Sequence, residues 1–244
     1  MVQAFAKSDV GRVREINEDY FSISYPNESV QVFLLADGMG GYDGGEIASQ
    51  LAVTTAKNYI LSNFEKTEKD RDNLLELVRS ATQYANMVVY DKAKERGNEE
   101  LRQMGTTLDI CLIYQNKLYF SHIGDSRIYR LRKGFFRRLT KDDSYVQQLV
   151  DEGKITKDEA VNHPDRNMLV KALGVAPYVE VEAADKGYMK DDVILMCSDG
   201  LTNMVSEEEI AQIILDNPSD ATGMLIQRAN DMGGKDNITA IIIR

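Results

Sequence analysis

The sequence predicts an α+β protein in which antiparallel β-sheets are covered by helices. Two observations lead to this fold class. Apolar stretches with the period of a strand alternate with longer stretches that have the period of a helix, in the order strands, helix pair, strands, helix pair, strand. In addition, no segment rich in Pro, Gly and Ser divides the 244 residues, so we expect a single domain over residues 1–244.

The first part of the chain supplies strands followed by a helix pair. Residues 2–7, 20–25 and 30–36 are apolar stretches of strand length. The period then changes, because apolar residues within 47–60 and 74–89 recur at three- and four-residue spacing. This spacing predicts two long amphipathic helices.

The middle of the chain returns to strands and then departs from them. The strand pattern runs from Thr106 to Leu139, and Arg132-Lys133-Gly134 fits the tight turn of a hairpin. Residues 140–174 are instead short, polar and helical in pattern, with a capping box at Thr156-x-x-Glu159. We expect this segment to be a surface insertion in the strand series.

The last part of the chain repeats the order of strands, helices and strand. Strands are expected near residues 178–184 and 192–198, and a closing strand at residues 238–243. One helix opens at Ser206-x-x-Glu209. A second is expected at Asn217-Pro218, with the asparagine as its cap and the proline in its first turn.

Composition excludes several classes of protein. The formal charge of −10 disfavours nonspecific binding to nucleic acid, which needs Lys and Arg to neutralise phosphates. No apolar run approaches the roughly 18 residues that span a bilayer, so we expect no membrane partner and a cytoplasmic location. Cys111 and Cys197 lie inside apolar runs, where a buried thiol is favoured over a disulfide or a zinc ligand. Nothing in the sequence demands more than a monomer.

Short acidic signatures stand beside the predicted strands, and they are the main indication of chemistry. They are Asn17-Glu18-Asp19, Asp37-Gly38-Met39-Gly40-Gly41, Gly124-Asp125-Ser126, Ser198-Asp199-Gly200 and Lys235-Asp236-Asn237. An Asp-Gly pair on its own usually marks a turn. Here three signatures follow strands and the last precedes one, so their carboxylates can gather at one edge of a sheet.

Carboxylates gathered in this way need a cation between them. Two unit charges about 4 Å apart repel by roughly 4 kcal/mol at an effective dielectric constant near 20. Ligands that are all oxygen favour Mg²⁺ or Mn²⁺ over softer ions. The sequence therefore predicts a site for hard divalent cations.

The signatures, taken together, closely resemble the metal-dependent protein phosphatases of type 2C in their bacterial form. The resemblance covers essentially the whole chain and also includes Gly11-x-x-Arg14, Gly45-Glu46, Gly105-Thr106-Thr107 and Asp236-Asn237-x-Thr239. It implies a four-layer αββα sandwich, two antiparallel sheets flanked by helix pairs. It further implies a serine/threonine phosphatase that hydrolyses phosphoserine and phosphothreonine esters by direct attack of a metal-bridging hydroxide. Phosphorylated proteins would be the substrates, and a cognate serine/threonine protein kinase would oppose the enzyme.

The resemblance assigns the metal ligands. Asp37 would bridge two Mn²⁺ or Mg²⁺ ions, with the Gly38 carbonyl on one ion and Asp199 and Asp236 on the other. Asp125 and Asp199 match the positions that hold a third, looser ion in bacterial members.

Further residues would act around the metals. Glu18 resembles the acid that orients metal-bound waters, and Asp19 would support the ligands. Arg14 resembles the phosphate clamp, since its guanidinium can meet two phosphate oxygens at once. Met39 takes the place of a histidine that usually follows the Asp-Gly pair in the eukaryotic branch. A thioether cannot donate a proton, so a metal-bound water near Asp125 is the expected proton donor, with His163 as the second choice.

Several alternatives stay open from the sequence. Arg14 could be a solvated surface charge, and His122 is expected to order the sheet, with no part in catalysis. Residues 140–174 correspond to the family's variable flap, which either gates substrates or is a solvated lid. The basic stretch of residues 127–138 is either a solvated hairpin or a docking site for acidic partners. A noncatalytic regulatory or phosphoprotein-binding domain of the same fold is the alternative function, and such a domain would usually lack a metal acid or the phosphate arginine.

Overall fold

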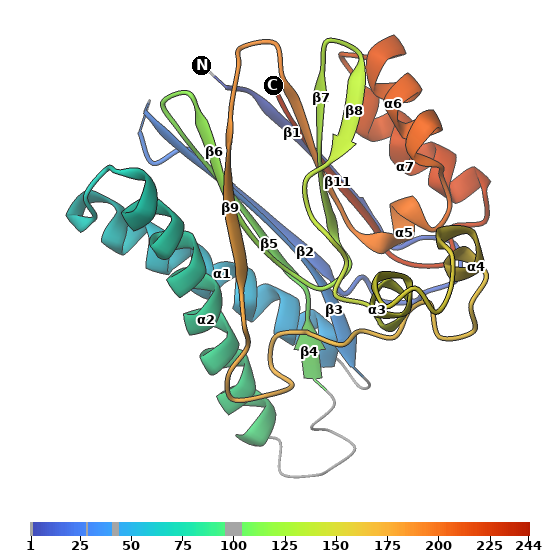
Figure 1. Ribbon diagram of the computed structural model, residues 1–244, viewed down its shortest axis with the longest axis horizontal. Helices are drawn as coiled ribbons and strands as arrows, with labels where there is room; N and C mark the ends of the chain where they lie inside the picture. Colours follow the sequence, from blue (N-terminus) through green and yellow to red (C-terminus); the bar gives the residue numbers. More distant parts are fainter. Residues whose placement is uncertain (1, 28, 41–43, 96–103) are drawn as a thin grey trace.

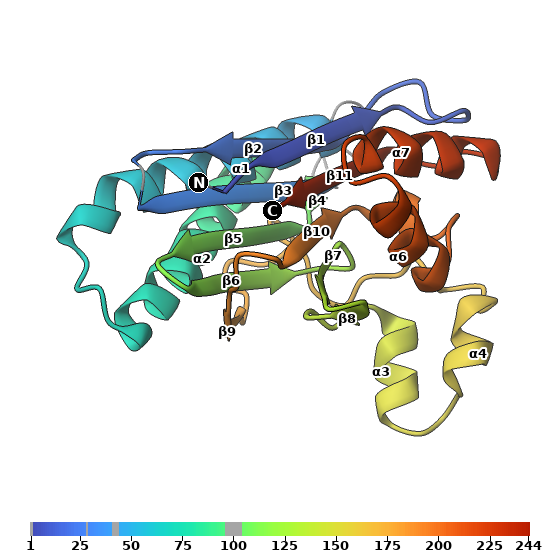
Figure 2. The ribbon, with the colours of Figure 1, turned by 90° about the horizontal axis from the view of Figure 1, so that it is seen from above.

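Four layers of secondary structure are stacked in the computed structural model, which describes residues 2–27, 29–40, 44–95 and 104–244. Within these ranges, two antiparallel sheets lie face to face, and helices cover the outer face of each (Figure 1, Figure 2). The architecture is therefore the four-layer αββα sandwich of the α+β class that the sequence and its resemblance predict. No helix in this part of the chain is long and apolar enough to cross a membrane.

The first sheet has the strand order β2-β3-β5-β6-β9, and β4 pairs with the end of β3. Its strands are β2 (Asp19–Ser24), β3 (Val30–Gly40), β4 (Met104–Thr106), β5 (Leu108–Tyr114), β6 (Lys117–Ile123) and β9 (Glu182–Gly187). Helices α1 (Gly44–Asn63) and α2 (Arg71–Glu95) cover its outer face, and the 3-10 helix η1 (Phe64–Lys66) lies between them in the chain. The two helices that the spacing of apolar residues predicts are thus confirmed.

The second sheet has the strand order β1-β11-β10-β7-β8. Its strands are β1 (Ala4–Asp9), β7 (Arg127–Arg132), β8 (Phe135–Arg138), β10 (Val193–Cys197) and β11 (Ile238–Ile243). Helices α6 (Glu207–Asp216) and α7 (Ala221–Asp231) pack on its outer face, and the short α5 (Asp199–Thr202) follows β10 directly. The sheet therefore joins the first strand of the chain to the last one.

The side chains of β3 show why a continuous apolar run forms a strand here. Val32 and Leu34 pack in the core under α1 and α2, whereas Phe33 and Leu35 pack in the core between the sheets. Successive side chains of a strand point to opposite faces, so a strand covered on both faces is apolar throughout. β10 and β11 divide their side chains in the same way between the middle core and the core under α6 and α7.

The hairpin that joins β7 to β8 has the predicted turn. Lys133 and Gly134 both have positive φ, 51° and 81°, which is the conformation of a two-residue type I′ turn. This turn follows the twist of the flanking strands, so β7 and β8 pair without a gap. β8 forms the edge of the second sheet.

The segment expected as an insertion forms α3 (Tyr145–Asp151) and α4 (Lys157–Val161). Figure 2 shows both helices projecting from the sandwich beside β8 and α6. The capping box of α4 is present, since Thr156 Oγ1 accepts from the Glu159 backbone N–H and the Glu159 carboxylate accepts from the Thr156 backbone N–H.

The predicted start of the last helix is wrong. Asn217 ends α6, and its Nδ2 donates to the Ile213 carbonyl at 3.1 Å. α7 begins at Ala221, with Asp220 at its N-cap position. An asparagine can cap either end of a helix, and a proline directly after it also fits a helix that has just ended, because Pro218 cannot continue one.

One strand boundary is also wrong. Residues 178–184 have the alternation of a strand, but β9 runs from Glu182 to Gly187 and pairs with β6 from Glu182 onward. Val179 and Val181 are buried in the core under α2 without joining the ladder. Alternating burial therefore mimics a strand at this point.

Candidate active site

The acidic signatures lie at one end of the sandwich. In antiparallel sheets, the end of one strand lies beside the start of its neighbour. β3, β6 and β10 end at this edge, while β2 and β11 begin at it. Electrostatic repulsion consequently acts on Asp37 from Asp19, Asp199, Asp125 and Asp236. The structure thus brings together the acids that the sequence predicts as one cluster.

Asp37 lies inside β3, whereas the sequence placed it after the strand. β3 continues through Gly40 because its last residues pair with β4; Gly41, which ends the sequence signature, lies outside the described residues. The Asp37 backbone N–H donates to Thr107 Oγ1 at 2.8 Å, and its carbonyl accepts from Thr106 Oγ1 at 2.9 Å. These bonds fix Asp37 opposite Asp19 of β2.

The carboxyl groups of the cluster repel one another strongly. Burial and then the neighbouring acids raise the pKa of Asp37 well above its usual range. Burial and then Asp236 raise the pKa of Asp199 to about 6. The carboxyl groups of Asp37 and Asp199 interact directly within the cluster. This concentration of negative charge and oxygen ligands fits a hard divalent cation.

Accessibility separates Asp19 from the other acids. Asp37, Asp125, Asp199 and Asp236 are each partly exposed, so a ligand can reach them from solvent. Asp19 is buried. It therefore lies behind the accessible acids.

Asp19 ties the two sheets together beneath the site. Its Oδ2 accepts from Ser198 Oγ and from Thr239 Oγ1, both at 2.7 Å. Its Oδ1 is buried without a hydrogen-bond partner among the described residues. Burial raises the pKa of Asp19 to about 7 against the opposing effect of the two hydroxyl donors. A buried oxygen without a hydrogen bond destabilises the folded protein. A ligand or a water molecule that binds this oxygen would remove the destabilisation.

Asp236 is held by its neighbours. Its Oδ2 accepts from Arg14 Nη2 at 2.9 Å, and its Oδ1 accepts from the Asn237 backbone N–H at 3.0 Å. Asp199 Oδ2 likewise accepts from Asn203 Nδ2 at 2.9 Å. Across the described ranges, no group of three or more Asp, Glu, His or Cys side chains is arranged as it stands to hold an ion. Metal binding by these acids therefore needs some of their side chains to move.

Glu18 lies beside Gly38 and Gly45, where no side chain fits. The Gly38 backbone N–H donates to the Glu18 carbonyl at 3.1 Å, and the Gly45 backbone N–H donates to the Glu18 carboxylate. A Cβ on Gly45 would lie 2.2 Å from Glu18 Oε1. Burial raises the pKa of Glu18, and Arg14 opposes that shift. The glycines therefore allow β3, α1 and Glu18 to approach closely.

Replacing Gly38 by Ala is expected to lower both stability and activity. The added Cβ would lie 2.1 Å from the Gly45 backbone carbonyl oxygen, so β3 and α1 must separate. Overpacking of this kind costs about 1–3 kcal/mol of unfolding free energy. The resemblance makes the Gly38 carbonyl a metal ligand, so its displacement should lower kcat/KM roughly tenfold or more. Thermal unfolding and kinetics on a phosphopeptide measure both effects, with Gly187→Ala as control because a Cβ there meets nothing within 4 Å.

Asp125 follows β6 in a loop fixed by its neighbours. Gly124 has φ of 109°, and a Cβ there would lie 2.5 Å from Thr107 Cγ2. The Gly124 backbone N–H donates to Asp143 Oδ2 at 3.2 Å, and the Asp143 N–H donates to the Gly124 carbonyl at 2.7 Å. Burial and then Asp199 raise the pKa of Asp125. The loop therefore directs Asp125 toward Asp199.

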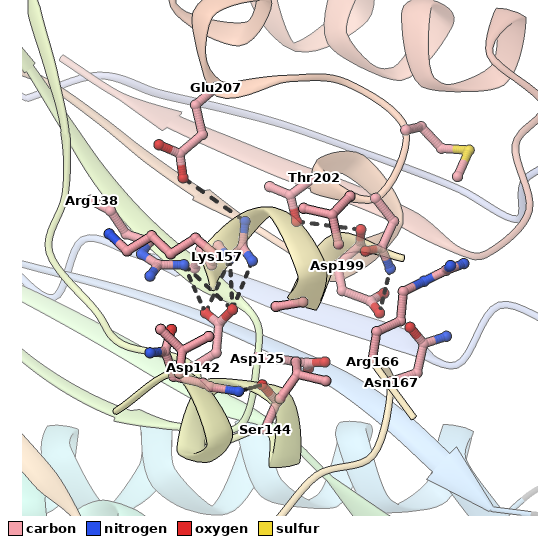
Figure 3. Close-up of a pocket in the computed structure, with 18 of the residues that line it drawn as sticks. Asp125, Arg138, Asp142, Ser144, Lys157, Arg166, Asn167, Asp199, Thr202 and Glu207 are labelled. Carbon is pink, nitrogen blue, oxygen red and sulfur yellow. Dashed lines mark hydrogen bonds and ion pairs between the residues drawn. The ribbon is translucent and has the colours of Figure 1, made fainter. Parts of the chain in front are cut away.

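A cavity of about 760 Å³ opens beside this pair of acids. Asp125 and Asp199 line one part of it, and α3, α4, β8 and the start of α6 supply much of the rest (Figure 3). Arg127 is bound to Asp142 within this wall, with Nη2 and Oδ2 2.7 Å apart. The acidic cluster is therefore open to a large ligand on its insertion side.

The two histidines of the chain lie away from the acids that the cavity exposes. His163 accepts from the Asp165 backbone N–H at 3.1 Å and packs edge-on against Tyr145 within the insertion. It does not line the cavity of Asp125 and Asp199, so the structure does not bring the second-choice proton donor to the site. His122 is buried and bound to Asp109, as a residue that orders the sheet would be.

Asn237 is a positioning residue to which the sequence analysis gave no role. Its Oδ1 accepts from the Glu18 backbone N–H at 2.8 Å, and its Nδ2 donates to the carbonyls of Val10 at 3.0 Å and Ile16 at 2.9 Å. A buried asparagine next to Asp236, within the Asp236-Asn237-x-Thr239 motif, was the available signal. It holds the loop that carries Arg14 and Glu18 against the start of β11.

Comparison with known proteins agrees with this arrangement. A family model described as Protein phosphatase 2C matches residues 12–231. The serine/threonine phosphatase stp of Listeria monocytogenes is 35% identical, over 97% of this chain and 93% of the relative.

Solved structures have the same fold over the whole chain. The serine/threonine phosphatase PstP/Ppp of Mycobacterium tuberculosis has a TM-score of 0.85 and 37% identity, covering 99% of this chain and 97% of that one. Stp1 of Staphylococcus aureus has a TM-score of 0.88 and 32% identity, covering 100% and 94%. The PstP catalytic domain in complex with two manganese ions has a TM-score of 0.83 and 35% identity, covering 99% and 97%. The chain belongs to the protein phosphatase 2C family.

Proposed function

We propose that this chain is a metal-dependent phosphatase that removes phosphate from phosphoserine and phosphothreonine in proteins. The observation that carries the proposal is the gathering of four partly exposed carboxylates next to Arg14, at the mouth of a large cavity; they are Asp37, Asp125, Asp199 and Asp236. Membership of the protein phosphatase 2C family supports the same activity.

Mn²⁺ or Mg²⁺ fits the ligands that the cluster offers. We assign Asp37, the Gly38 carbonyl, Asp199 and Asp236 to two ions, and Asp125 with Asp199 to a third. When bound, such ions lower the pKa of a water molecule and offset the negative charge of the phosphoryl group. The manganese-bound PstP catalytic domain supports this choice of ion.

The residues around the metal ligands bind and orient the substrate and water. Arg14 is half-exposed, with 51% of its side chain accessible, so its guanidinium can leave Asp236 and receive two phosphate oxygens. Glu18, fixed by Gly45 and Asn237, accepts a hydrogen bond from water at the cluster. Asp19 keeps β2 and β11 together behind these groups.

The hydrolysis needs one proton to move to the leaving group. A bond forms between phosphorus and the water oxygen, and the ester bond to the serine or threonine oxygen breaks. Water loses a proton, and the leaving oxygen gains one. Met39 has no proton to give, so we assign this proton to a water molecule next to Asp125.

The broader setting of the enzyme follows from the same proposal. We propose one catalytic domain over residues 1–244, with residues 140–174 as its flap, acting as a monomer. A serine/threonine protein kinase that phosphorylates the same targets would be its opponent. The cytoplasmic location expected from the sequence stays a prediction.

Phosphate release from a phosphothreonine peptide tests the proposal. We expect release with Mn²⁺, loss of release with excess EDTA and recovery when Mn²⁺ is added back. Binding of the peptide without any release would instead indicate a noncatalytic phosphoprotein-binding domain. Equal release with and without EDTA would contradict the role of the metal.

Replacing Arg14 by Ala is expected to lower kcat/KM about 10- to 100-fold, because a hydrogen bond between charged groups contributes roughly 1.5–3 kcal/mol. Arg14→Lys keeps the charge but cannot contact two phosphate oxygens with one planar group. Its kcat/KM should therefore lie between those of the wild type and Arg14→Ala. Steady-state kinetics on the same phosphopeptide measures the series. Arg12→Ala, an exposed arginine two residues away, is the control. An unchanged kcat/KM in Arg14→Ala would show that Arg14 is only a surface charge.

A further inference from the structure

The structure separates the basic residues of the β7–β8 hairpin into paired and unpaired ones. Arg127 and Arg138 both bind Asp142, and Arg132 binds Asp192 with Nη2 and Oδ2 2.6 Å apart. Arg137 makes no such contact in the described part of the chain. Three of the six basic side chains in residues 127–138 therefore pair with acids of the protein, and Arg137 is among those that are available to a ligand.

Arg137 belongs to a set of unpaired basic side chains that line the cavity beside Asp125 and Asp199. The set, called the basic wall here, consists of Arg137, Lys157, Arg166 and Lys235. All of its members are exposed, and none makes a side-chain hydrogen bond or ion pair with another described residue. Figure 3 shows Lys157 and Arg166 on either side of Asp125 and Asp199 in that view.

The acids of the cavity do not neutralise the basic wall. Asp142 is bound by two arginines, and Glu207 forms an ion pair with Arg127, with Oε1 and Nη1 3.9 Å apart. The remaining acids are Asp125 and Asp199, which the proposed function assigns to cations. The cavity thus presents net positive charge next to the site of reaction, in a protein whose formal charge is −10.

The positive surface continues beyond the cavity. A second hollow of about 480 Å³ shares Arg137 and Phe136 with the first and is also lined by Arg130, Arg132, Lys133 and Phe135. Phe135 is 80% exposed there. An extended polypeptide that leaves the acidic cluster along β8 would therefore pass basic side chains throughout.

We propose that the basic wall selects phosphoproteins that carry Asp or Glu next to the phosphorylated residue. This inference rests on the proposed function and names its substrate class. Carboxylates of the substrate would pair with Lys157 and Arg166 from the insertion and with Arg137 from β8. The contacts are exposed to solvent, so they act mainly through attraction and orientation of the substrate and weaken as salt rises.

Two phosphothreonine peptides test the proposal. They have the same sequence except that three flanking Glu residues in one are Gln in the other. We expect kcat/KM to be about tenfold higher for the Glu peptide at low salt, since exposed ion pairs contribute about 0.2–1 kcal/mol each. In the double variant Lys157→Ala, Arg166→Ala, the ratio of the two values should fall about threefold or more, because two of the ion pairs are lost while Arg137 and Lys235 remain.

The control removes the same amount of charge elsewhere. Lys186 and Lys190 are exposed and lie outside both hollows, so the double variant Lys186→Ala, Lys190→Ala should keep the wild-type ratio. Equal values for the two peptides in the wild type would overturn the inference. An unchanged ratio in the Lys157→Ala, Arg166→Ala variant would also overturn it. An equal fall of the ratio in the Lys186→Ala, Lys190→Ala control would do the same.

A binding measurement keeps the two proposals distinguishable. If neither peptide releases phosphate, the proposed function fails, and fluorescence anisotropy of the labelled peptides decides the present inference. Tighter binding of the Glu peptide that depends on Lys157 and Arg166 would support the basic wall as an acidic-peptide site. Equal binding of the two peptides would refute it.

Discussion

Replacing Asp37 by Asn should lower kcat/KM by at least ~10³-fold, because the charge at the centre of the cluster is needed to hold the cations that activate water. The fold should survive. Burial and four neighbouring carboxylates raise the pKa of Asp37, so removing its charge relieves both desolvation and repulsion in the metal-free protein. We therefore expect the melting temperature in EDTA to stay the same or rise.

Kinetics at saturating Mn²⁺ and thermal unfolding with and without the metal measure these effects. Mn²⁺ should raise the melting temperature of the wild type, since a ligand that binds the folded state stabilises it, and should raise that of Asp37→Asn much less. Asp191→Asn, which changes an exposed aspartate outside the cluster, is the matched control. Activity of Asp37→Asn within tenfold of the wild type would contradict the assignment.

Replacing His122 by Ala is expected to cause the largest loss of stability, about 3–5 kcal/mol, because it leaves the Asp109 carboxylate buried without its charged partner. The two side chains are almost completely buried, with Nδ1 and Oδ1 2.6 Å apart. His122 Nε2 also contacts the Lys141 carbonyl at 2.9 Å, where the insertion begins. For a protein of this size the loss corresponds to a fall in melting temperature on the order of 10 °C.

A double variant separates loss of the charge pair from loss of packing. Asp109→Asn combined with His122→Ala removes both charges, so it should be less destabilised than the sum of the single changes. His163→Ala, at the partly exposed histidine, should change the unfolding free energy little. Strict additivity of the two buried changes would refute the ion pair.

The same pair predicts how stability depends on pH. Burial alone would lower the pKa of His122, but the Asp109 carboxylate raises it to about 9. A raised pKa in the folded state stabilises the protein below the unfolded value of about 6.5, and this stabilisation is lost as the pH rises toward 9. The difference in unfolding free energy between the wild type and His122→Ala should therefore shrink over this range in denaturant titrations.

Much of the fold could be predicted because local patterns and the final packing agree. Some local patterns are compatible with only one kind of structure. Examples are the apolar run of β3, the spacing of apolar residues in α1 and α2, and the turn at Lys133-Gly134. The pattern failed where two structures satisfy it equally. Asn217-Pro218 suits the end of a helix as well as the start, and Val179 and Val181 alternate without forming a ladder.

The residues of the site could be predicted from the sequence, but the contacts between them could not. Distant acids were recognised because strand ends meet at one edge of an antiparallel sheet and because their order resembles a known family. The contact of Arg14 with Asp236, the proximity of Asp37 and Asp199, and the role of Asn237 depend on side-chain geometry across loops. No pattern within one segment encodes such contacts.

Anomalous diffraction from crystals grown with Mn²⁺ locates the ions relative to named side chains, so it decides whether the acids around Asp37 form a metal site. We expect two strong peaks next to the Asp37 carboxylate, one of them also within ligand distance of Asp199 and Asp236, with Arg14 released from Asp236. Crystals of Asp37→Asn should lose both peaks. The absence of any manganese peak within ligand distance of Asp37 in the wild type would show that these acids do not form the proposed metal site.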